Sequence, residues 1–423
     1  MRVDFPYAGF APLVVPDHNL AGVYEPREHP ACPDVPACVA RALAQPIGSP
    51  RLQDLATGAK SALIISDDHT RQTPVRAIIP LVASALEEAG VREQDIRILI
   101  ASGTHRPMTD DEKLHKFGPD FCRRFVIVNH EWQDEENLVA VGLTSSGTEV
   151  RVNRLVTQGD VVIGLGQVAP HRIAGYSGGA KIILPGVCGA AATASTHWAG
   201  GLRPGDDMLG VWDNPVRREM NEAARLAGLT FIVNAVCDPA GRVIGIFAGS
   251  PTDAHQTAAE VARRVFGVDV PSQTDIVITD SFPMDTELWQ AAKALYAVEL
   301  MVKPGGIVIL VSPCHEGVSR SHPLILERGY RPEAQTLEDV RSGRLADLLV
   351  ASHCLRVGRV IRDRATGILV STGIPPADAR RLGFIPAATA QEALDIAFEM
   401  TGRDARVAVL CHGGEALPLM HRA

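Results

Sequence analysis

Short apolar runs alternate with longer amphipathic segments along this 423-residue chain. The runs are rich in β-branched residues, and several lack polar alternation, which is typical of strands buried on both faces of a parallel sheet. Helix candidates such as residues 74–89, with Thr73 as the expected N-cap, lie between the runs. The strand candidates are residues 62–66, 96–101, 125–129, 160–165, 276–279, 306–312, 348–351, 368–371 and 407–411. This alternation predicts the α/β class with mainly parallel sheets.

The length of the chain predicts two domains, because one hydrophobic core rarely serves more than about 300 residues. The polar segment 267–274 contains Pro271 and precedes a new series of strands and helices, so we expect the boundary there. The prediction is an N-terminal α/β domain of residues 1–270 and a C-terminal α/β domain of residues 275–402. The closing segment, residues 403–423, is expected to rejoin the first domain.

Composition excludes several classes of partner. The net charge is −8 and the basic residues are scattered, whereas nucleic-acid binding requires a concentrated basic surface. No apolar run reaches the roughly 18 residues of a membrane span, and the first residues do not form a secretory signal. The eight cysteines form no CxxC pair, which favours reduced thiols. We therefore expect a cytoplasmic protein with neither a nucleic-acid nor a membrane partner.

Polar residues follow two neighbouring strand candidates. Asp67, Asp68, His69, Thr70 and Arg71 stand between the first of these strands and the helix that begins at Pro74. Ligands collect at the carboxyl ends of parallel strands, and the N–H groups of a helix start attract anions. An arginine there can bind a phosphate or carboxylate at two points. His105 closes the next strand, so it is expected at the same edge.

A glycine-rich segment, residues 175–181, ends at Lys181. It differs from a phosphate-binding P-loop because Ala180 and Ile182 flank the lysine, so ATP hydrolysis is not indicated. A lysine can instead form a covalent bond to a carbonyl-type carbon. His171 precedes the segment and His197 follows it. Two imidazoles can exchange protons near neutral pH, and a third can hold a metal. The set reads as an active site.

The second domain contributes one candidate pair. Gln290 and Lys293 are three residues apart and share a helix face, so an amide and a cation could bind one carboxylate together. A solvated helix face is the alternative interpretation of this pair. The chain has no HExxH motif, so a metal site built wholly from protein ligands is not supported.

Together these segments resemble the nickel-pincer-dependent lactate racemase family. The resemblance runs in order over most of the chain. The matching pieces are Asp67–Pro74, Ser102–Arg106, His171 with Ala174–Lys181, Ile183–Gly186, His197, and the Gln290 and Lys293 pair.

The resemblance implies two α/β domains with an active site in the cleft between them. It also implies a nickel-carrying pyridinium-3,5-bisthiocarboxylic acid mononucleotide, covalently attached at Lys181 and supplied by cofactor-synthesis enzymes. On this basis His197 is the protein ligand of nickel, and His105 and His171 are the catalytic acid/base pair. Gln290 and Lys293 bind the substrate carboxylate. The expected cofactor contacts are Asp68, His69, Thr70, Arg71, Ser177, Gly178, Gly179 and Lys181.

The implied activity is a racemase or epimerase that interconverts the enantiomers of a 2-hydroxy acid, by hydride abstraction and return at C2 through the nickel-pincer nucleotide. Trp289 stands where we expect tyrosine in the lactate enzyme, so malate, aromatic and sugar acids remain candidate substrates beside lactate. Two other functions remain open. One is a cofactor-independent racemase or lyase that uses the histidines and Lys181, and the other is a non-catalytic nickel-nucleotide carrier.

Overall fold

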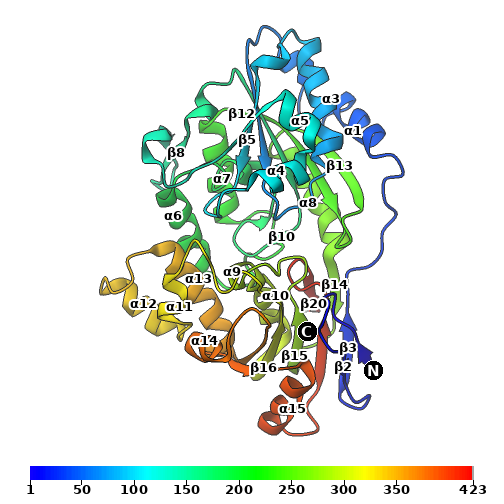
Figure 1. The fold of residues 1–423 in the computed structure, drawn as a ribbon, viewed down its shortest axis with the longest axis vertical. Coiled ribbons are helices and arrows are strands. Elements are labelled where there is room, and N and C mark those ends of the chain that lie inside the picture. Colours follow the sequence, from blue (N-terminus) through cyan, green and yellow to red (C-terminus); the bar gives the residue numbers. More distant parts are fainter. Residues whose placement is uncertain (422–423) are drawn as a thin grey trace. The chain divides into compact units, whose positions relative to one another are not determined.

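The computed structural model describes residues 1–421, and it divides into two compact units. Unit 1 comprises Met1–Arg27, His197–Gly210 and the chain from Phe266 onward. Unit 2 comprises Glu28–Thr196 and Val211–Val265. Each unit is built around its own six-stranded sheet with helices packed against it (Figure 1). The predicted α/β class with mainly parallel sheets is confirmed.

The sheet of unit 2 has the strand order β13-β12-β9-β4-β5-β6. Its strands are β4 (Ala62–Asp67), β5 (Ile96–Ala101), β6 (Val126–Asn129), β9 (Val161–Gln167), β12 (Leu229–Cys237) and β13 (Val243–Gly249). All pairs are parallel except β12 with β13. Two small hairpins pair β7 (Leu138–Leu143) with β8 (Glu149–Asn153) and β10 (Pro170–His171) with β11 (Gly175–Tyr176).

The helices of unit 2 are α1 (Val35–Ala44), α2 (Leu52–Leu55), α3 (Val75–Glu88), α4 (Asp110–Phe117), α5 (Pro119–Arg124), α7 (Pro215–Leu226) and α8 (Asp253–Phe266). Short 3-10 turns are Glu93–Asp95, Glu135–Asn137, Arg154–Thr157 and Gly179–Ile182. Helix α6 (Ala190–Gly201) continues from unit 2 into unit 1.

The sheet of unit 1 is parallel throughout, in the order β18-β17-β16-β15-β19-β3. Its strands are β3 (Leu20–Tyr24), β15 (Thr274–Asp280), β16 (Val302–Val311), β17 (Ala365–Val370), β18 (Ile385–Ala387) and β19 (Val407–Leu410). Short pairs join β1 (Arg2–Val3) to β2 (Leu13–Val14) and β14 (Gly267–Val270) to β20 (Leu417–Met420). Its helices are α9 (Leu288–Ala291), α10 (Lys293–Met301), α11 (Leu324–Arg328), α12 (Glu333–Arg341), α13 (Leu348–Gly358), the π-helix Arg359–Arg364, α14 (Pro376–Leu382) and α15 (Ala390–Thr401).

The core of unit 2 shows why its strands form where the apolar runs are. Every residue of β4 is buried, as the absence of polar alternation predicts. Helix α3 covers this sheet with Val75, Ile78, Ile79 and Val82, the spacing of one apolar helix face. The N-cap of α3 is Pro74 rather than the predicted Thr73, whose hydroxyl instead donates to Asp67.

One strand prediction is wrong. Residues 348–351 open helix α13, where the Asp347 carboxylate accepts from the N–H groups of Leu349 (2.9 Å) and Val350 (3.0 Å). A short apolar run does not distinguish a strand from a buried helix, and the N-cap decides between them here. The other strand candidates coincide with strands. In the two large sheets, β3, β12, β13 and β18 were not predicted.

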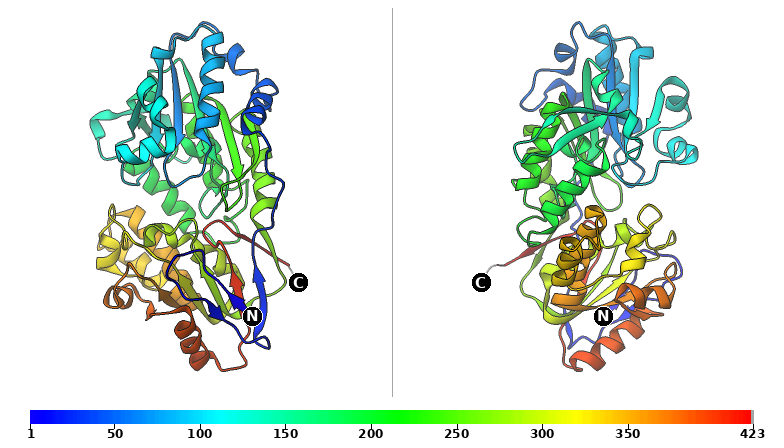
Figure 2. Two further views of the ribbon diagram at one scale, coloured as in Figure 1. Left: turned by 45° about the vertical axis from the view of Figure 1, so that its right-hand side comes forward. Right: turned by 90° about the vertical axis from the view of Figure 1, so that its left-hand side faces the viewer.

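The expected return of residues 403–423 to the first sheet is also corrected. Strand β19 lies between β15 and β3 in the sheet of unit 1. The blue strand β3 therefore runs beside the red strand β19 (Figure 2). Asn19 fixes this pairing, since its side-chain amide donates to the carbonyls of Arg403 (2.7 Å) and Ala405 (3.0 Å). The first 27 residues thus complete the second sheet rather than the first.

Within residues 1–421, no helix combines the length and apolar character that crossing a membrane requires.

Candidate active site

Two adjacent carboxylates stand at the end of β4, and each holds a different partner. Asp67 accepts from the Thr73 hydroxyl, from the Gln167 N–H at 2.9 Å and from Lys116 Nζ at 2.9 Å. These bonds tie the ends of β4 and β9 to helix α4. Asp68 accepts from the Thr70 N–H (3.0 Å) and hydroxyl (2.5 Å), so it closes the turn that leads to α3.

Asp68 also orients His105, as the placement of both residues at one sheet edge predicted. The ring Nδ1 lies 2.8 Å from the Asp68 carboxylate. Burial alone would raise the pKa of Asp68, but the charge and hydrogen bond of His105 and the charges of His69 and Arg71 hold it well below its usual range. A charged carboxylate requires a proton on Nδ1, so the neutral ring presents the lone pair of Nε2. The His105 side chain is 26% exposed and can reach a ligand.

His171 has the opposite arrangement. It lies in β10, where the hairpin pairs it with Gly175. Its Nδ1 accepts from the N–H groups of Ile173 (3.2 Å) and Ala174 (3.1 Å). In the neutral ring the proton therefore sits on Nε2. The two predicted catalytic imidazoles thus differ: His105 presents an acceptor and His171 presents a donor.

The glycine-rich segment lies against neighbouring backbone too closely for side chains. A Cβ at Gly175, where φ is +74°, would lie 2.0 Å from the Val211 carbonyl oxygen. The Ser177 hydroxyl accepts from the Ala169 N–H (2.9 Å) and donates to the Gln167 carbonyl (2.8 Å). Asn234 accepts from the Gly179 N–H at 2.9 Å. These contacts fix the backbone of the segment that immediately precedes Lys181.

Lys181 is only partly exposed, and its surroundings disfavour the charged amine. Burial is the largest cause, the charges of Arg71 and Arg217 act in the same direction, and Asp68 and Asp67 act against them. Together they lower the pKa of Lys181 to about 7. Near neutral pH a large fraction of this amine is therefore unprotonated, which is the form that attacks a carbonyl-type carbon.

Other predicted cofactor contacts lie around the same turn. His69 Nδ1 is buried and has no hydrogen-bond partner among the described residues, while Nε2 lies 3.7 Å from Glu112. Arg71 donates to the Thr70 carbonyl at 3.0 Å. An unsatisfied imidazole nitrogen, a guanidinium and a neutral lysine suit an anionic nucleotide with a reactive acyl-type group. The residues present therefore fit the implied cofactor.

Three predicted site residues belong to unit 1. His197 lies in α6, and its carbonyl accepts from the Ser352 hydroxyl of α13 at 2.6 Å. Among the described residues no group of three His, Cys, Asp or Glu side chains could hold a metal. His197 as the protein ligand of nickel stays a prediction. The cleft between the domains stays a prediction.

The Gln290 and Lys293 side chains meet, because Lys293 Nζ donates to Gln290 Oε1. Nζ also lies 3.6 Å from Met284 Sδ. Gln290 is 4% exposed, which excludes the solvated-face interpretation for the amide. Directly beside them, Trp289 is stacked between the rings of His322 and His353, with centroids 4.4 Å away on each side. No sequence motif pointed to these two histidines.

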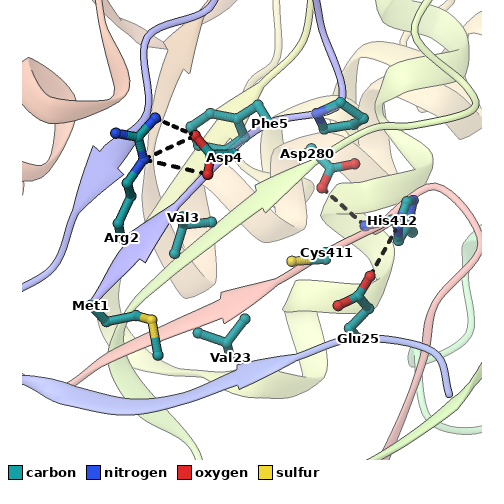
Figure 3. Close-up of a pocket in the computed structure, with 11 residues that line it drawn as sticks. Met1, Arg2, Val3, Asp4, Phe5, Val23, Glu25, Asp280, Cys411 and His412 are labelled. Carbon is teal, nitrogen blue, oxygen red and sulfur yellow. Dashed lines mark hydrogen bonds and ion pairs between the residues drawn. The ribbon is translucent and has the colours of Figure 1, made fainter.

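A separate cavity of about 360 Å³ lies in unit 1 at the ends of β15, β19 and β3 (Figure 3). Its Asp280 accepts from the N–H groups of Phe282 (2.9 Å) and His412 (3.0 Å). Glu25 lies 3.5 Å from His412 Nε2, and Arg2 pairs with Asp4. Its charged groups thus pair among themselves and anchor the strand ends.

Comparison with known proteins agrees with this fold. Residues 8–207 match the family described as the lactate racemase N-terminal domain, and residues 270–415 match the lactate racemase C-terminal domain. The lactate racemase of Thermoanaerobacterium thermosaccharolyticum is 36% identical over 282 residues, which span 66% of each chain. The lactate racemase of Lactiplantibacillus plantarum is 31% identical over 391 residues, 89% of each chain.

Solved structures give the same result. The lactate racemase apoprotein from Thermoanaerobacterium thermosaccharolyticum matches over 100% of both chains, with a TM-score of 0.88 and 30% identity. A protein from Thermotoga maritima shares the fold, with a TM-score of 0.74 and 23% identity over 92% of this chain and 97% of its own. The fold and the relatives, which are racemases, define an enzyme of the isomerase class. The chain belongs to the lactate racemase family.

Proposed function

We propose that this protein is a racemase or epimerase of 2-hydroxy acids that uses a nickel-pincer nucleotide bound covalently at Lys181. The observation that carries the proposal is the opposite setting of two imidazoles: His105 is backed by a carboxylate and His171 by two backbone N–H groups. Interconversion of enantiomers needs one group that takes a hydroxyl proton and another that donates one.

The proposed roles follow from these settings. His105 Nε2 accepts the hydroxyl proton of one enantiomer while Asp68 stabilises the imidazolium that forms. His171 donates toward the same oxygen from the other side, and the roles reverse for the opposite enantiomer. When bound, the nickel-pincer group supplies a reversible hydride acceptor for C2. His197 would supply one imidazole ligand to the nickel, a donor that suits this metal.

Gln290 and Lys293 hold the substrate carboxylate in this proposal. Their side chains already contact each other, so a carboxylate would find an amide N–H and an ammonium group in one place. The relatives' names make lactate the first candidate substrate. Trp289 is fixed by an imidazole on each face, so it forms a rigid wall beside this pair. Because Trp289 stands where tyrosine is expected in the lactate enzyme, malate, aromatic and sugar acids stay among the candidate substrates.

Chiral analysis of the cofactor-loaded protein with each single enantiomer of these acids tests the proposal. We expect both enantiomers of at least one acid to reach the same equilibrium mixture. Stoichiometric cofactor without turnover of any acid would instead favour a carrier, whose function requires no acid/base pair. Full turnover by nickel-free protein would favour the cofactor-independent racemase or lyase.

Two further parts of the proposal concern supply and location. A preformed nickel nucleotide must come from cofactor-synthesis enzymes, which we infer to be partners of this chain in the cytoplasm. Expression with and without those enzymes, followed by measurement of bound nickel, tests this dependence.

A further inference from the structure

Arg217 carries a buried charge that no carboxylate balances. It lies in α7, is 1% exposed, and its guanidinium donates to three carbonyls of the glycine-rich segment. These are the carbonyls of Ala174 (3.2 Å), Gly178 (3.2 Å) and Tyr176. Burial lowers the pKa of Arg217 to about 9, so the group is still charged at neutral pH. Within the described residues its side chain has no acidic partner.

The carboxylates near Lys181 are already engaged. Asp67 accepts from Lys116 and Thr73, and Asp68 accepts from His105 and Thr70. In the described part of the chain, no hydrogen bond or ion pair joins either of them to Lys181 Nζ. Burial is the largest cause of the lowered pKa of Lys181. The charges of Arg71 and Arg217 act in the same direction, because a cation disfavours a second nearby cation, and Asp68 and Asp67 act against them.

A second buried group holds the loop without adding charge. His255 Nε2 bonds the Ser177 carbonyl at 2.8 Å, and Trp212 Nε1 donates to His255 Nδ1 at 3.1 Å. Burial and the charge of Arg217 hold the pKa of His255 well below its usual range, so this ring is neutral. Arg217 is therefore the charged member of the framework that holds the loop.

We propose that Arg217 is a positioning residue that fixes the glycine-rich loop and that its uncompensated charge adds to burial and to Arg71 in favouring the neutral amine of Lys181. Its planar guanidinium donates to the three carbonyls in a fixed geometry, whereas a lysine ammonium is a compact point charge on a flexible stem. The two effects, geometry and charge, can thus be separated by substitution. The use of a neutral amine rests on the proposed covalent attachment of the cofactor at Lys181. The protonation state of Lys181 can be measured whether or not that proposal holds.

The test measures acylation of Lys181 against pH in cofactor-free protein. A limiting amount of an N-hydroxysuccinimide ester is added between pH 6 and 11, a window of about five units that spans the ordinary lysine pKa. Peptide mass spectrometry then reads the labelling of Lys181, with exposed Lys60 in the same unit as the internal control for reagent reactivity. The wild-type midpoint for Lys181 is expected near 7.

Two variants separate charge from geometry. Arg217→Gln removes the charge and should raise the Lys181 midpoint toward the ordinary lysine value, by up to about one unit, since burial and Arg71 remain. His255→Ala removes a neutral side chain that bonds the Ser177 carbonyl of the same loop and leaves the Arg217 charge in place. The midpoint should therefore stay near that of the wild type although the loop is less well held. A midpoint unchanged in folded Arg217→Gln, or raised equally in both variants, would overturn the proposal.

If Arg217→Gln does not fold, as circular dichroism would reveal, the His255→Ala variant decides. A Lys181 midpoint that rises although the positive charge is retained contradicts the charge mechanism, and an unchanged midpoint supports it. A wild-type midpoint near the ordinary lysine value would also overturn it. Because no cofactor or substrate is present, these outcomes are independent of whether the protein racemises any acid.

Discussion

The carboxyl edges of the two sheets carry acidic residues that do different work. In unit 2, Asp68 bonds an imidazole, and its pKa is held well below the usual range although the residue is buried. In unit 1, Asp280 bonds two backbone N–H groups, and burial raises its pKa to about 6. The comparison teaches that strand-end position alone does not define a reactive site. The partner decides whether a carboxylate tunes an ionisable group or anchors a loop.

The largest difference between the two edges is expected at the lysine of the unit 2 loop. Lys181→Ala should abolish the covalent adduct when the protein is made together with the cofactor-synthesis enzymes, because no other amine occupies that position. Intact mass spectrometry under denaturing conditions reads this directly. Lys303→Ala, which removes a surface lysine paired with Asp275 in unit 1, should keep the adduct. An adduct that persists in Lys181→Ala would contradict the assignment.

The two imidazoles that we propose as the acid/base pair should give the next largest effect. His105→Ala and His171→Ala should each lower kcat by roughly 10²–10⁴-fold, the usual contribution of general acid–base catalysis, while cofactor loading is retained. His412→Ala removes the imidazole at the edge of unit 1 and should leave kcat close to wild type. If His412→Ala lost as much activity as the other two, the distinction between the edges would fail.

Loss of Lys293, which we propose as a substrate-binding residue of unit 1, should have a more modest effect. Lys293→Ala should lower kcat/KM by an amount that corresponds to about 1.5–3 kcal/mol of transition-state stabilisation, the contribution of a charged hydrogen bond. The steady-state kinetics of Lys303→Ala, matched for the loss of one lysine, serve as the control. Wild-type kinetics in Lys293→Ala would mean that the Lys293 and Gln290 contact is structural only.

The smallest expected effects are on the pH dependence of the free energy of unfolding. One group in each unit contributes, and the two contributions have opposite signs. Lys181 has a lowered pKa, so the unfolded state binds more protons between about 7 and 10.5, and the free energy of unfolding rises with pH there. Asp280 has a raised pKa, so the folded state binds more protons between 3.8 and about 6, and the free energy of unfolding falls as pH rises.

Urea unfolding of cofactor-free protein across these ranges checks both signs. Lys181→Met should flatten the rise above pH about 7, and Asp280→Asn should flatten the fall below pH about 6. Slopes identical to wild type in both variants would show that neither group titrates differently in the folded state.

The sequence predicted much of the fold because buried parallel strands leave uninterrupted apolar runs, as in β4 and β5. It also placed Asp68 and His105 at one edge, and the structure joins them at 2.8 Å. It did not reveal Arg217, whose acceptors are backbone carbonyls 39 to 43 residues away in the chain and leave no motif. Nor could it assign β19, because strand pairing depends on partners far apart in sequence.

The sandwich of His322, Trp289 and His353 had no sequence signal for the same reason. Its members come from α9, from the segment before α11 and from α13. Residues 348–351 read as a strand because the apolar run was short, and only the Asp347 cap reveals the helix. Local patterns therefore identified most elements, whereas long-range contacts decided which residues surround the site.

The fate of the substrate's C2 hydrogen tests the central claim most directly. One enantiomer of a turned-over 2-hydroxy acid is incubated with cofactor-loaded protein in D₂O, and the opposite enantiomer is isolated and analysed by mass spectrometry. Hydride abstraction and return predicts that the product keeps its original hydrogen at C2, because that hydrogen never exchanges with solvent. Deuterium at C2 would show that a base removes C2–H as a proton, which would contradict the account and favour a cofactor-independent racemase.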